Sequence, residues 1–132
     1  MSLEAIGVVV ADLDRARGFY RLLGLEIAPD PEGHGHAEAE LAGGIRLMFD
    51  TPAVMKSFDP SWEHRPGSTN ASLAFSFESP GEVDAKVQEL VEAGATIHLE
   101  PWDAFWGMRY ASLRDPDGNA IDLYALLPQN GD

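Results

Sequence analysis

Two segments of the chain place apolar residues three or four positions apart, as one face of a helix does. The first segment, Leu13–Leu23, follows Asp12, which is a predicted N-cap. The second follows the capping box Ser79-Pro80-Gly81-Glu82, which puts proline at the first helical position, and it runs to Ala93. Each segment is followed by a glycine, a residue typical of helix ends. The pattern therefore predicts two helices.

Short segments that alternate apolar and polar residues, or are uniformly apolar, surround the two helices and predict strands. These segments are Leu3–Val10, Leu25–Ala28, Ala37–Leu41, Ile45–Phe49, Ala71–Phe77, Ala95–Leu99, Met108–Leu113 and Ala120–Ala125. The order of strand, helix and three strands therefore occurs twice. It predicts an α+β fold of two βαβββ units, at about 1–50 and 71–127, joined by a connection at about 51–70 within one domain, 1–132.

The last predicted strand carries the clearest candidate for a site residue. The segment Asp115-Pro116-Asp117-Gly118-Asn119 predicts a tight hairpin, because proline presets one turn dihedral and glycine permits a positive φ. In the strand that follows, Ile121 and Leu123 alternate with Asp122 and Tyr124. Asp122 should therefore point away from the apolar side and act as a polar anchor in a binding site.

Composition and charge narrow the range of functions. A chain of 132 residues can bury a sufficient hydrophobic core without disulfide bonds, and this chain has no cysteine. The net charge of −13 disfavours nucleic acid and anionic lipid surfaces as partners and favours neutral or cationic small molecules. No leader or membrane-spanning run is evident in the sequence, so we expect a cytoplasmic protein that has no membrane partner.

Four motifs, in order along nearly the whole chain, resemble the vicinal oxygen chelate superfamily of glyoxalases, bleomycin resistance proteins and extradiol dioxygenases. They are Val10-Ala11-Asp12-Leu13-Asp14-Arg15-Ala16 with Phe19-Tyr20 and Leu23-Gly24-Leu25, then Ala93-Gly94-Ala95, Trp106-Gly107-Met108-Arg109, and Asp115 to Tyr124. The resemblance implies two paired βαβββ units that form a curled mixed sheet around a cup-shaped cleft. The units pair within one chain or between two, and we expect a homodimer.

In metal-dependent members, the resemblance implies ligands on four strands, usually histidine, glutamine and glutamate. The corresponding positions here are Ala5, Ser72, Asp122 and either Arg46 or Met48. Only Asp122 is a typical ligand, whereas a divalent ion generally needs three or more protein donors. We therefore predict no metal and no other cofactor, and we interpret the four histidines as solvated or singly hydrogen-bonded.

The cup is predicted to hold an organic molecule instead. Small residues on the first strand of each unit would leave room for a bulky ligand, and the aromatic segment before Gly107 would offer flat apolar surfaces, unless those rings only close the core. Arg109 would reach the ligand or pair with a neighbouring acid. The predicted ligand-binding residues are Asp122, Trp102, Trp106, Phe105, Arg109, Met48, Tyr124 and Ser72, and no catalytic residue is assigned.

Three functions fit these residues. The leading one is metal-free binding or sequestration of a bulky aromatic or cationic small molecule, as in bleomycin resistance-like proteins that bind antibiotics. The second is a lyase, isomerase or dioxygenase that uses a divalent metal held by Asp122 and histidines. The third is metal-free acid–base catalysis by Asp122, for which the sequence shows no second catalytic group.

Overall fold

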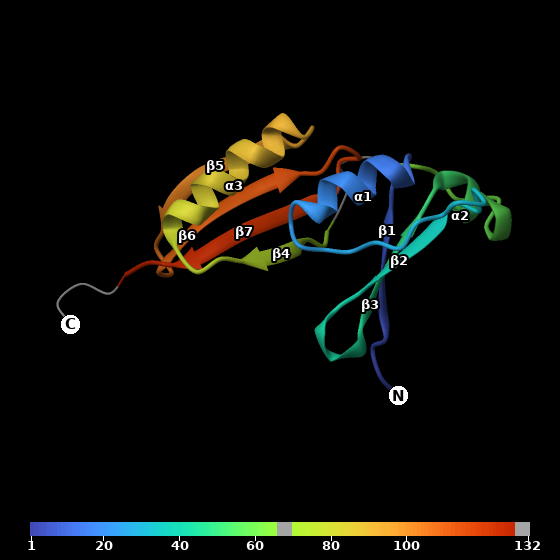
Figure 1. The fold of residues 1–132 in the computed structure, drawn as a ribbon, viewed down its shortest axis with the longest axis horizontal. Coiled ribbons are helices and arrows are strands. Elements are labelled where there is room, and N and C mark those ends of the chain that lie inside the picture. Colours follow the sequence, from blue (N-terminus) through green and yellow to red (C-terminus); the bar gives the residue numbers. More distant parts are fainter. Residues whose placement is uncertain (66–69, 129–132) are drawn as a thin grey trace. The chain divides into compact units, whose positions relative to one another are not determined.

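The computed structural model describes residues 1–65 and 70–128. The chain divides into two compact units, Met1–Pro66 (unit 1) and Gly67–Asp132 (unit 2). Each has its own sheet, with helices α1 and α2 in unit 1 and helix α3 in unit 2 (Figure 1). Within the described residues the elements form two mixed sheets with helices against them, which confirms the predicted α+β class.

Unit 1 contains a three-stranded sheet in the order β1-β3-β2. Strand β1 runs parallel to β3, and β2 runs antiparallel to it. The elements are β1 (Ala5–Val9), α1 (Leu13–Arg21), β2 (His36–Glu40), a 3-10 turn (Ala42–Gly44), β3 (Arg46–Asp50) and α2 (Pro52–Phe58).

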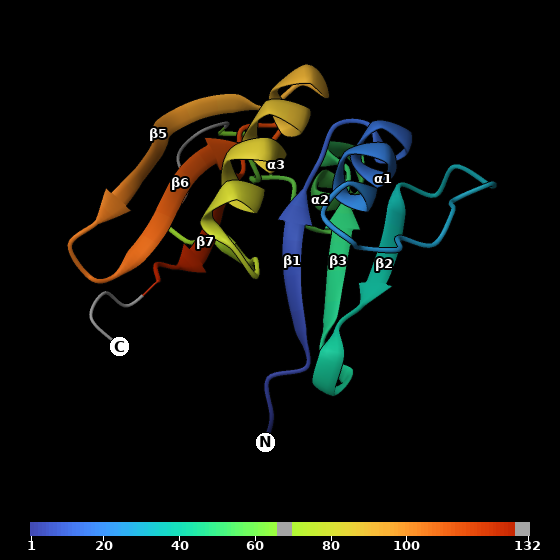
Figure 2. The same cartoon turned by 60° about the vertical axis from the view of Figure 1, so that its left-hand side comes forward.

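Helix α1 forms where the pattern predicts it and covers one face of this sheet (Figure 2). Its predicted N-cap is confirmed, since the Asp12 carboxylate accepts a hydrogen bond from the backbone N–H of Arg15 at 3.1 Å. The ring of Tyr20 contacts that of Phe49 on β3, with centroids 5.2 Å apart. Because Leu47 and Phe49 are buried while Arg46, Met48 and Asp50 are not, the second group lies on the other face.

Unit 2 contains a four-stranded sheet in the order β4-β7-β6-β5. Strands β4 and β7 are parallel, whereas β5, β6 and β7 form antiparallel pairs. The elements are β4 (Leu73–Ser76), α3 (Pro80–Glu92), β5 (Thr96–Ala104), β6 (Met108–Arg114) and β7 (Ala120–Leu126).

Helix α3 begins at the predicted capping box, in which both reciprocal hydrogen bonds between Ser79 and Glu82 are present. The helix lies against the sheet (Figure 2). Its residues Val83, Val87 and Leu90 are buried. The predicted hairpin before β7 is also confirmed. The Asp115 carboxylate accepts the backbone N–H groups of Asp117 and Asn119, each at 2.8 Å, and Gly118 has the positive φ that closes the turn.

Three segments differ from the prediction. Leu25–Ala28 is not a strand and forms only one isolated bridge, between Ile27 and Ala39, because it lacks a run of backbone partners. The predicted connection contains helix α2, which starts with proline at a position that favours helix initiation. Strand β5 continues through Ala104, so Trp102 lies on a strand and not in a connection. Residues 66–69 of that predicted connection lie outside the described residues.

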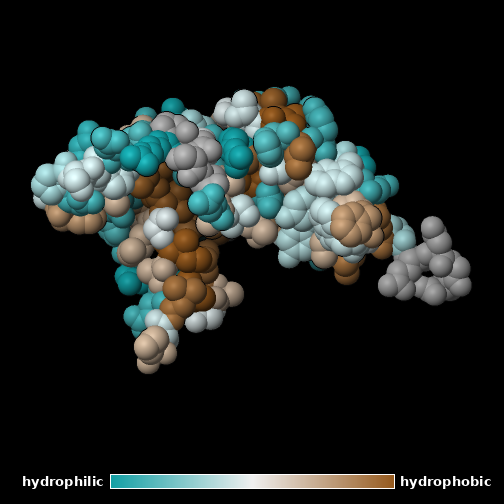
Figure 3. Space-filling view, turned by 180° about the vertical axis from the view of Figure 1, so that it is seen from behind, coloured by the Kyte–Doolittle hydropathy of each residue, from teal (hydrophilic) through white to brown (hydrophobic). Residues whose placement is uncertain are grey.

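Several large apolar side chains remain exposed, and one surface view shows brown apolar areas among teal hydrophilic ones (Figure 3). The exposed side chains include Leu3, Ile6, Phe58, Leu99, Phe105, Trp106 and Leu126. None of the helices in the described part of the chain has the length and apolar character that a bilayer crossing requires.

Candidate functional site

The sheet of unit 2 has a helix-covered face and an open face, and three of the predicted site residues, Asp122, Trp102 and Tyr124, lie on the open one. Ile121, Leu123 and Ala125 are fully or almost fully buried, whereas Asp122 and Tyr124 between them are only half-buried. Strand pairing places Ala74, Ser112 and Tyr110 beside these last two residues. We call this surface the Asp122 face; its residues are Ala74, Ser76, Trp102, Tyr110, Ser112, Asp122 and Tyr124.

Asp122 is the polar centre of this face. Its Oδ1 accepts a hydrogen bond from the Ser112 hydroxyl at 2.9 Å. Its Oδ2 accepts bonds from the hydroxyls of Tyr110 at 2.8 Å and Ser72 at 3.2 Å. These donors are all neutral, so the carboxylate is oriented without being neutralised. Among the described residues, no lysine, arginine or histidine forms a salt bridge with Asp122.

Tyr110 is held in its neutral form by this arrangement. Burial raises the pKa of its phenol to about 12, and the hydrogen bond to Asp122 and the negative charge of that carboxylate add to the effect. The phenol therefore stays protonated at physiological pH and donates to Asp122. It serves as a fixed hydrogen-bond donor and not as a base.

An aromatic cluster lies next to the carboxylate. The rings of Trp102, Trp106 and Tyr110 contact one another edge to face, with centroids 5.4 to 5.9 Å apart. Tyr124 stacks on Tyr110 at 6.2 Å, and Phe105 contacts Trp106 at 5.0 Å. Trp106 is 47% exposed and Phe105 is 96% exposed, so these rings do not simply close a core.

Arg109 does not lie on the Asp122 face. Its guanidinium donates to both carboxylate oxygens of Asp84 on α3, at 3.0 and 3.2 Å, and to Asp103 at 3.1 Å. The hydrogen bonds to Asp84 raise the pKa of Arg109 further. The sequence analysis gave Arg109 two possible roles, contact with a ligand or an ion pair with a neighbouring acid, and the structure shows the ion pair. It fastens the helix to the sheet.

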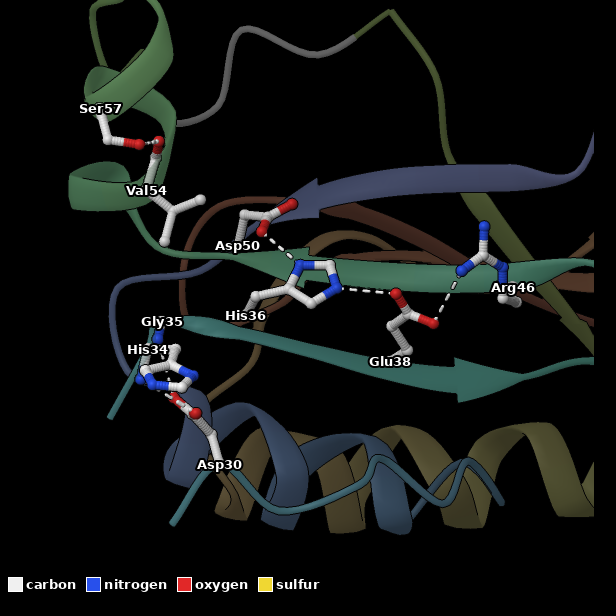
Figure 4. A network of polar contacts seen from close by, with 9 residues as sticks. All are labelled: Asp30, His34, Gly35, His36, Glu38, Arg46, Asp50, Val54 and Ser57. Carbon is white, nitrogen blue, oxygen red and sulfur yellow. Dashed lines mark hydrogen bonds and ion pairs between the residues drawn. The ribbon is translucent and has the colours of Figure 1, made fainter. Parts of the chain in front are cut away.

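Met48 belongs to unit 1, where strand pairing places it opposite Glu38. It is half-buried on β3, also opposite Gly7 of β1. Glu38 is part of a charged network on β2 and β3 (Figure 4). His36 Nδ1 lies 2.6 Å from Asp50 Oδ1, and His36 Nε2 lies 2.7 Å from Glu38 Oε2. Arg46 Nη1 donates to Glu38 Oε1 at 3.1 Å. Charges of alternating sign thus follow one another along β2 and β3.

His36 was not predicted as a site residue, and its surroundings differ from the expected solvated or singly bonded state. The hydrogen bonds to Glu38 and Asp50 raise the pKa of the imidazole above 6.5, and the bond to His36 lowers the pKa of Glu38. The signal in the sequence is the alternation of His36, Glu38 and Glu40 with small or apolar residues, which starts one residue before the predicted strand. Of the other histidines, His34, His64 and His98 are exposed.

The residues at the positions that correspond to the metal ligands of metal-dependent members do not fit a divalent ion. Ala5 offers no donor and Ser72 only a hydroxyl, while Asp122 is already held by three hydroxyl groups. In the part of the chain that the structure describes, no three histidine, aspartate or glutamate side chains are grouped to hold a metal. Function without a metal remains a prediction based on this donor set.

A groove of about 480 Å³ lies in unit 2 between the end of β4 and α3, and Ser76 of the Asp122 face is one of its lining residues. Phe77 and Ala85 line it together with Glu82 and Lys86. Glu82 closes the capping box, and Lys86 donates to Glu89 at 2.6 Å, so both charges have structural partners. None of the predicted site residues lines this groove.

Comparison with known proteins defines the class to which this fold belongs. The model of the Glyoxalase/Bleomycin resistance protein/Dioxygenase superfamily matches residues 2–123. The chain belongs to this superfamily, which confirms the resemblance found in its motifs. No curated protein sequence matches the chain.

Solved structures show the same fold at low sequence identity. A glyoxalase-related enzyme from Fulvimarina pelagi has a TM-score of 0.79 at 20% identity, over 94% of this chain and 87% of that one. A hypothetical protein from S. aureus has a TM-score of 0.78 at 20% identity, over 94% and 92%. A glyoxalase/bleomycin resistance protein/dioxygenase family enzyme from Burkholderia phytofirmans PsJN has a TM-score of 0.76 at 19% identity, over 96% and 100%. At these identities the similarity establishes the fold alone.

Proposed function

We propose that this protein binds and sequesters a bulky aromatic cation on the Asp122 face, without a metal. The observation that carries the proposal is a carboxylate that, among the described residues, is held only by neutral hydroxyls, next to a cluster of partly exposed aromatic rings. The predicted homodimer, the cytoplasmic location and the cup between βαβββ units belong to the same proposal.

Charge balance explains why the ligand should be cationic. Hydroxyl donors orient Asp122 but leave its full negative charge in place, and a cation close to an oriented carboxylate gains both a Coulombic contact and a charge-assisted hydrogen bond. The net charge of −13 would also raise the rate at which cations approach the protein. An anionic ligand would meet the opposite effect.

The rings explain why the ligand should also be aromatic. Trp102, Trp106 and Tyr124 present apolar faces and edges that favour flat ring systems. A cation over such a face gains roughly 0.5 to 2 kcal/mol. Exposed Ala74 and Ser76 on β4 leave room beside the carboxylate, because their side chains are small.

Tryptophan fluorescence tests the ring contact. Two flat dyes of matched ring size, one cationic and one neutral, are titrated into the full chain. We expect the cationic dye to quench the emission in a saturable way, and the quenching to be lost in Trp102→Phe and Trp106→Phe. Trp62→Phe is the matched control, because Trp62 lies in unit 1, stacked on His64, and should leave the quenching unchanged. Equal quenching in all three variants would contradict the proposal.

Asp122→Asn tests the charge separately from the rings. This variant keeps an oxygen that accepts hydrogen bonds, so the fold should persist. We expect the affinity for the cationic dye to fall about tenfold or more, and that for the neutral dye to change little. A stoichiometric divalent metal in protein purified without an affinity tag, lost in Asp122→Ala, would instead support the metal-dependent enzyme.

A further inference from the structure

His36 of unit 1 lies between two carboxylates that approach opposite sides of its ring (Figure 4). Asp50 on β3 faces Nδ1, and Glu38, two residues further along β2, faces Nε2. A doubly protonated ring donates to both. A neutral ring has one N–H, so one carboxylate must then face a nitrogen lone pair.

The net charge around His36 depends on the other charged groups that lie near it. Arg46 on β3 holds the second oxygen of Glu38, and Glu40 on β2 lies opposite Arg46. The preceding loop contributes His34 and Asp30, and the Asp30 carboxylate accepts the backbone N–H groups of residues 34 and 35. Strand β1 places only Ala5, Gly7 and Val9 on this face, and the charged residue of α2 is Lys56. With a protonated ring, Asp50, His36, Glu38 and Arg46 together carry no net charge.

The two carboxylates differ in how well water could replace the lost contact. The Asp50 side chain is 16% exposed, whereas that of Glu38 is 34% exposed and already has Arg46 as a partner. Leaving Asp50 without a donor therefore costs more free energy than leaving one oxygen of Glu38 to solvent. The remaining proton should stay on Nδ1.

We propose that His36 is a pH-sensitive latch: its doubly protonated ring bridges Asp50 and Glu38, and loss of one proton releases Glu38 while the contact with Asp50 persists. Release leaves the network with one net negative charge and frees a carboxylate oxygen on the open face of unit 1. The raised pKa of His36 puts this change above pH 6.5. The latch does not depend on any ligand of the Asp122 face.

Nuclear magnetic resonance of the full chain, labelled with ¹⁵N and ¹³C, tests the latch by titration. We expect the His36 ring to lose a proton with a midpoint above 6.5 and to be neutral as the Nδ1–H tautomer. The side-chain carboxyl carbon of Glu38 should shift at the same midpoint, because its donor leaves then. A midpoint at or below 6.5, the Nε2–H tautomer, or a Glu38 signal that does not respond would overturn the proposal.

Variants separate the latch from a general effect of charge. Glu38→Gln should lower the His36 midpoint, since the carboxylate that favours the second proton is gone. His34→Gln is the matched control, because His34 is exposed and pairs only with Glu32 among the ion pairs of the described residues. It should leave the His36 midpoint unchanged. If both variants shifted the midpoint equally, the specific role of Glu38 would be refuted.

Discussion

The open faces of the two units hold an aspartate in contrasting ways. In each unit the aspartate lies on the strand that runs parallel to the first strand of that unit, Asp50 on β3 and Asp122 on β7. Asp50 faces a histidine that carries a positive charge when protonated, and the charges continue through Glu38 to Arg46. Asp122 faces hydroxyl groups and aromatic rings. The same architecture thus yields one balanced carboxylate, Asp50, which has a partner that can carry a positive charge, and one unbalanced carboxylate, Asp122, whose partners are neutral.

This difference underlies the two roles that we propose, a structural one for Asp50 and a binding one for Asp122. A network with compensating charges gains little from an added cation and responds mainly to protons. A carboxylate that neutral donors hold keeps its charge available for a ligand. The backbone fold does not decide between these outcomes. The side chains on the neighbouring strand do, His36 in unit 1 and Ser112 and Tyr110 in unit 2.

The largest expected effect concerns the segment that leads into the unit 1 network. Gly35 has a φ of +87°, and a Cβ there would lie 2.6 Å from Thr51 Oγ1 and 2.8 Å from Val54 Cγ2. We expect Gly35→Ala to destabilise unit 1 by about 2 to 4 kcal/mol, from backbone strain and steric overlap together. Chemical denaturation measures this loss.

Gly33→Ala is the control for the steric part of that loss. Gly33 also has a positive φ, of +69°, but a Cβ there would meet no atom within 4 Å. Its substitution should cost only the strain of a left-handed backbone, about 1 to 2 kcal/mol. Equal losses in the two variants would show that the close approach of Gly35 to Thr51 and Val54 adds nothing to the backbone strain.

The second prediction removes the unbalanced carboxylate. Asp122→Ala leaves the hydroxyls of Tyr110, Ser112 and Ser72 without their acceptor, and Ser112 is only 8% exposed. We expect a loss of about 1 to 3 kcal/mol in the free energy of unfolding. Asp122→Asn keeps an acceptor oxygen and should lose less. A fully stable Asp122→Ala variant would mean that the hydroxyls find water as readily as the carboxylate.

The sequence was most informative where local chemistry decides the structure. The N-cap at Asp12, the capping box at Ser79 and the hairpin after Asp115 each depend on a few adjacent residues, and all three are confirmed. The alternation that placed Asp122 away from the core is confirmed for the same reason. Two of the four motifs that indicated the superfamily include the N-cap at Asp12 and the hairpin after Asp115.

The sequence was less informative where partners lie far apart along the chain. The Leu25–Ala28 segment has strand-like residues but only one bridge partner, which no local pattern reveals. The pairing of His36 with Asp50 depends on the register between β2 and β3. The hydroxyl donors of Asp122 lie 10 to 50 residues away from it in the chain. Alternation predicted the side on which Asp122 lies but not the side chains that contact it.

The third prediction removes one hydroxyl donor from Asp122. Tyr110→Phe keeps the ring contacts and deletes the 2.8 Å bond, at a cost of about 0.5 to 1.5 kcal/mol. Because the pKa of Tyr110 is raised to about 12, its contribution to stability is full below pH 10.0 and is lost as the pH rises through about 12. In an ultraviolet titration, the variant should lack the phenol that ionises near pH 12. An unchanged titration curve would contradict a pKa of about 12 for Tyr110.

The smallest expected effect concerns the balanced network. Because folding raises the pKa of His36, the protonated His36 ring contributes its full stabilisation below pH 6.5. This stabilisation is lost as the pH rises through the folded-state pKa. The lowered pKa of Glu38 stabilises the fold above pH 4.5 and this stabilisation is lost as the pH falls through its folded-state pKa. The network should therefore contribute most to stability between pH 4.5 and pH 6.5.

Because the His36 ring is 39% exposed and solvent screens its charge, His36→Gln should cost no more than about 1 kcal/mol at pH 5.5 and less at pH 8.5. Chemical denaturation at the two pH values measures the difference, and a larger loss at the higher pH would contradict the stabilising role of the protonated His36 ring.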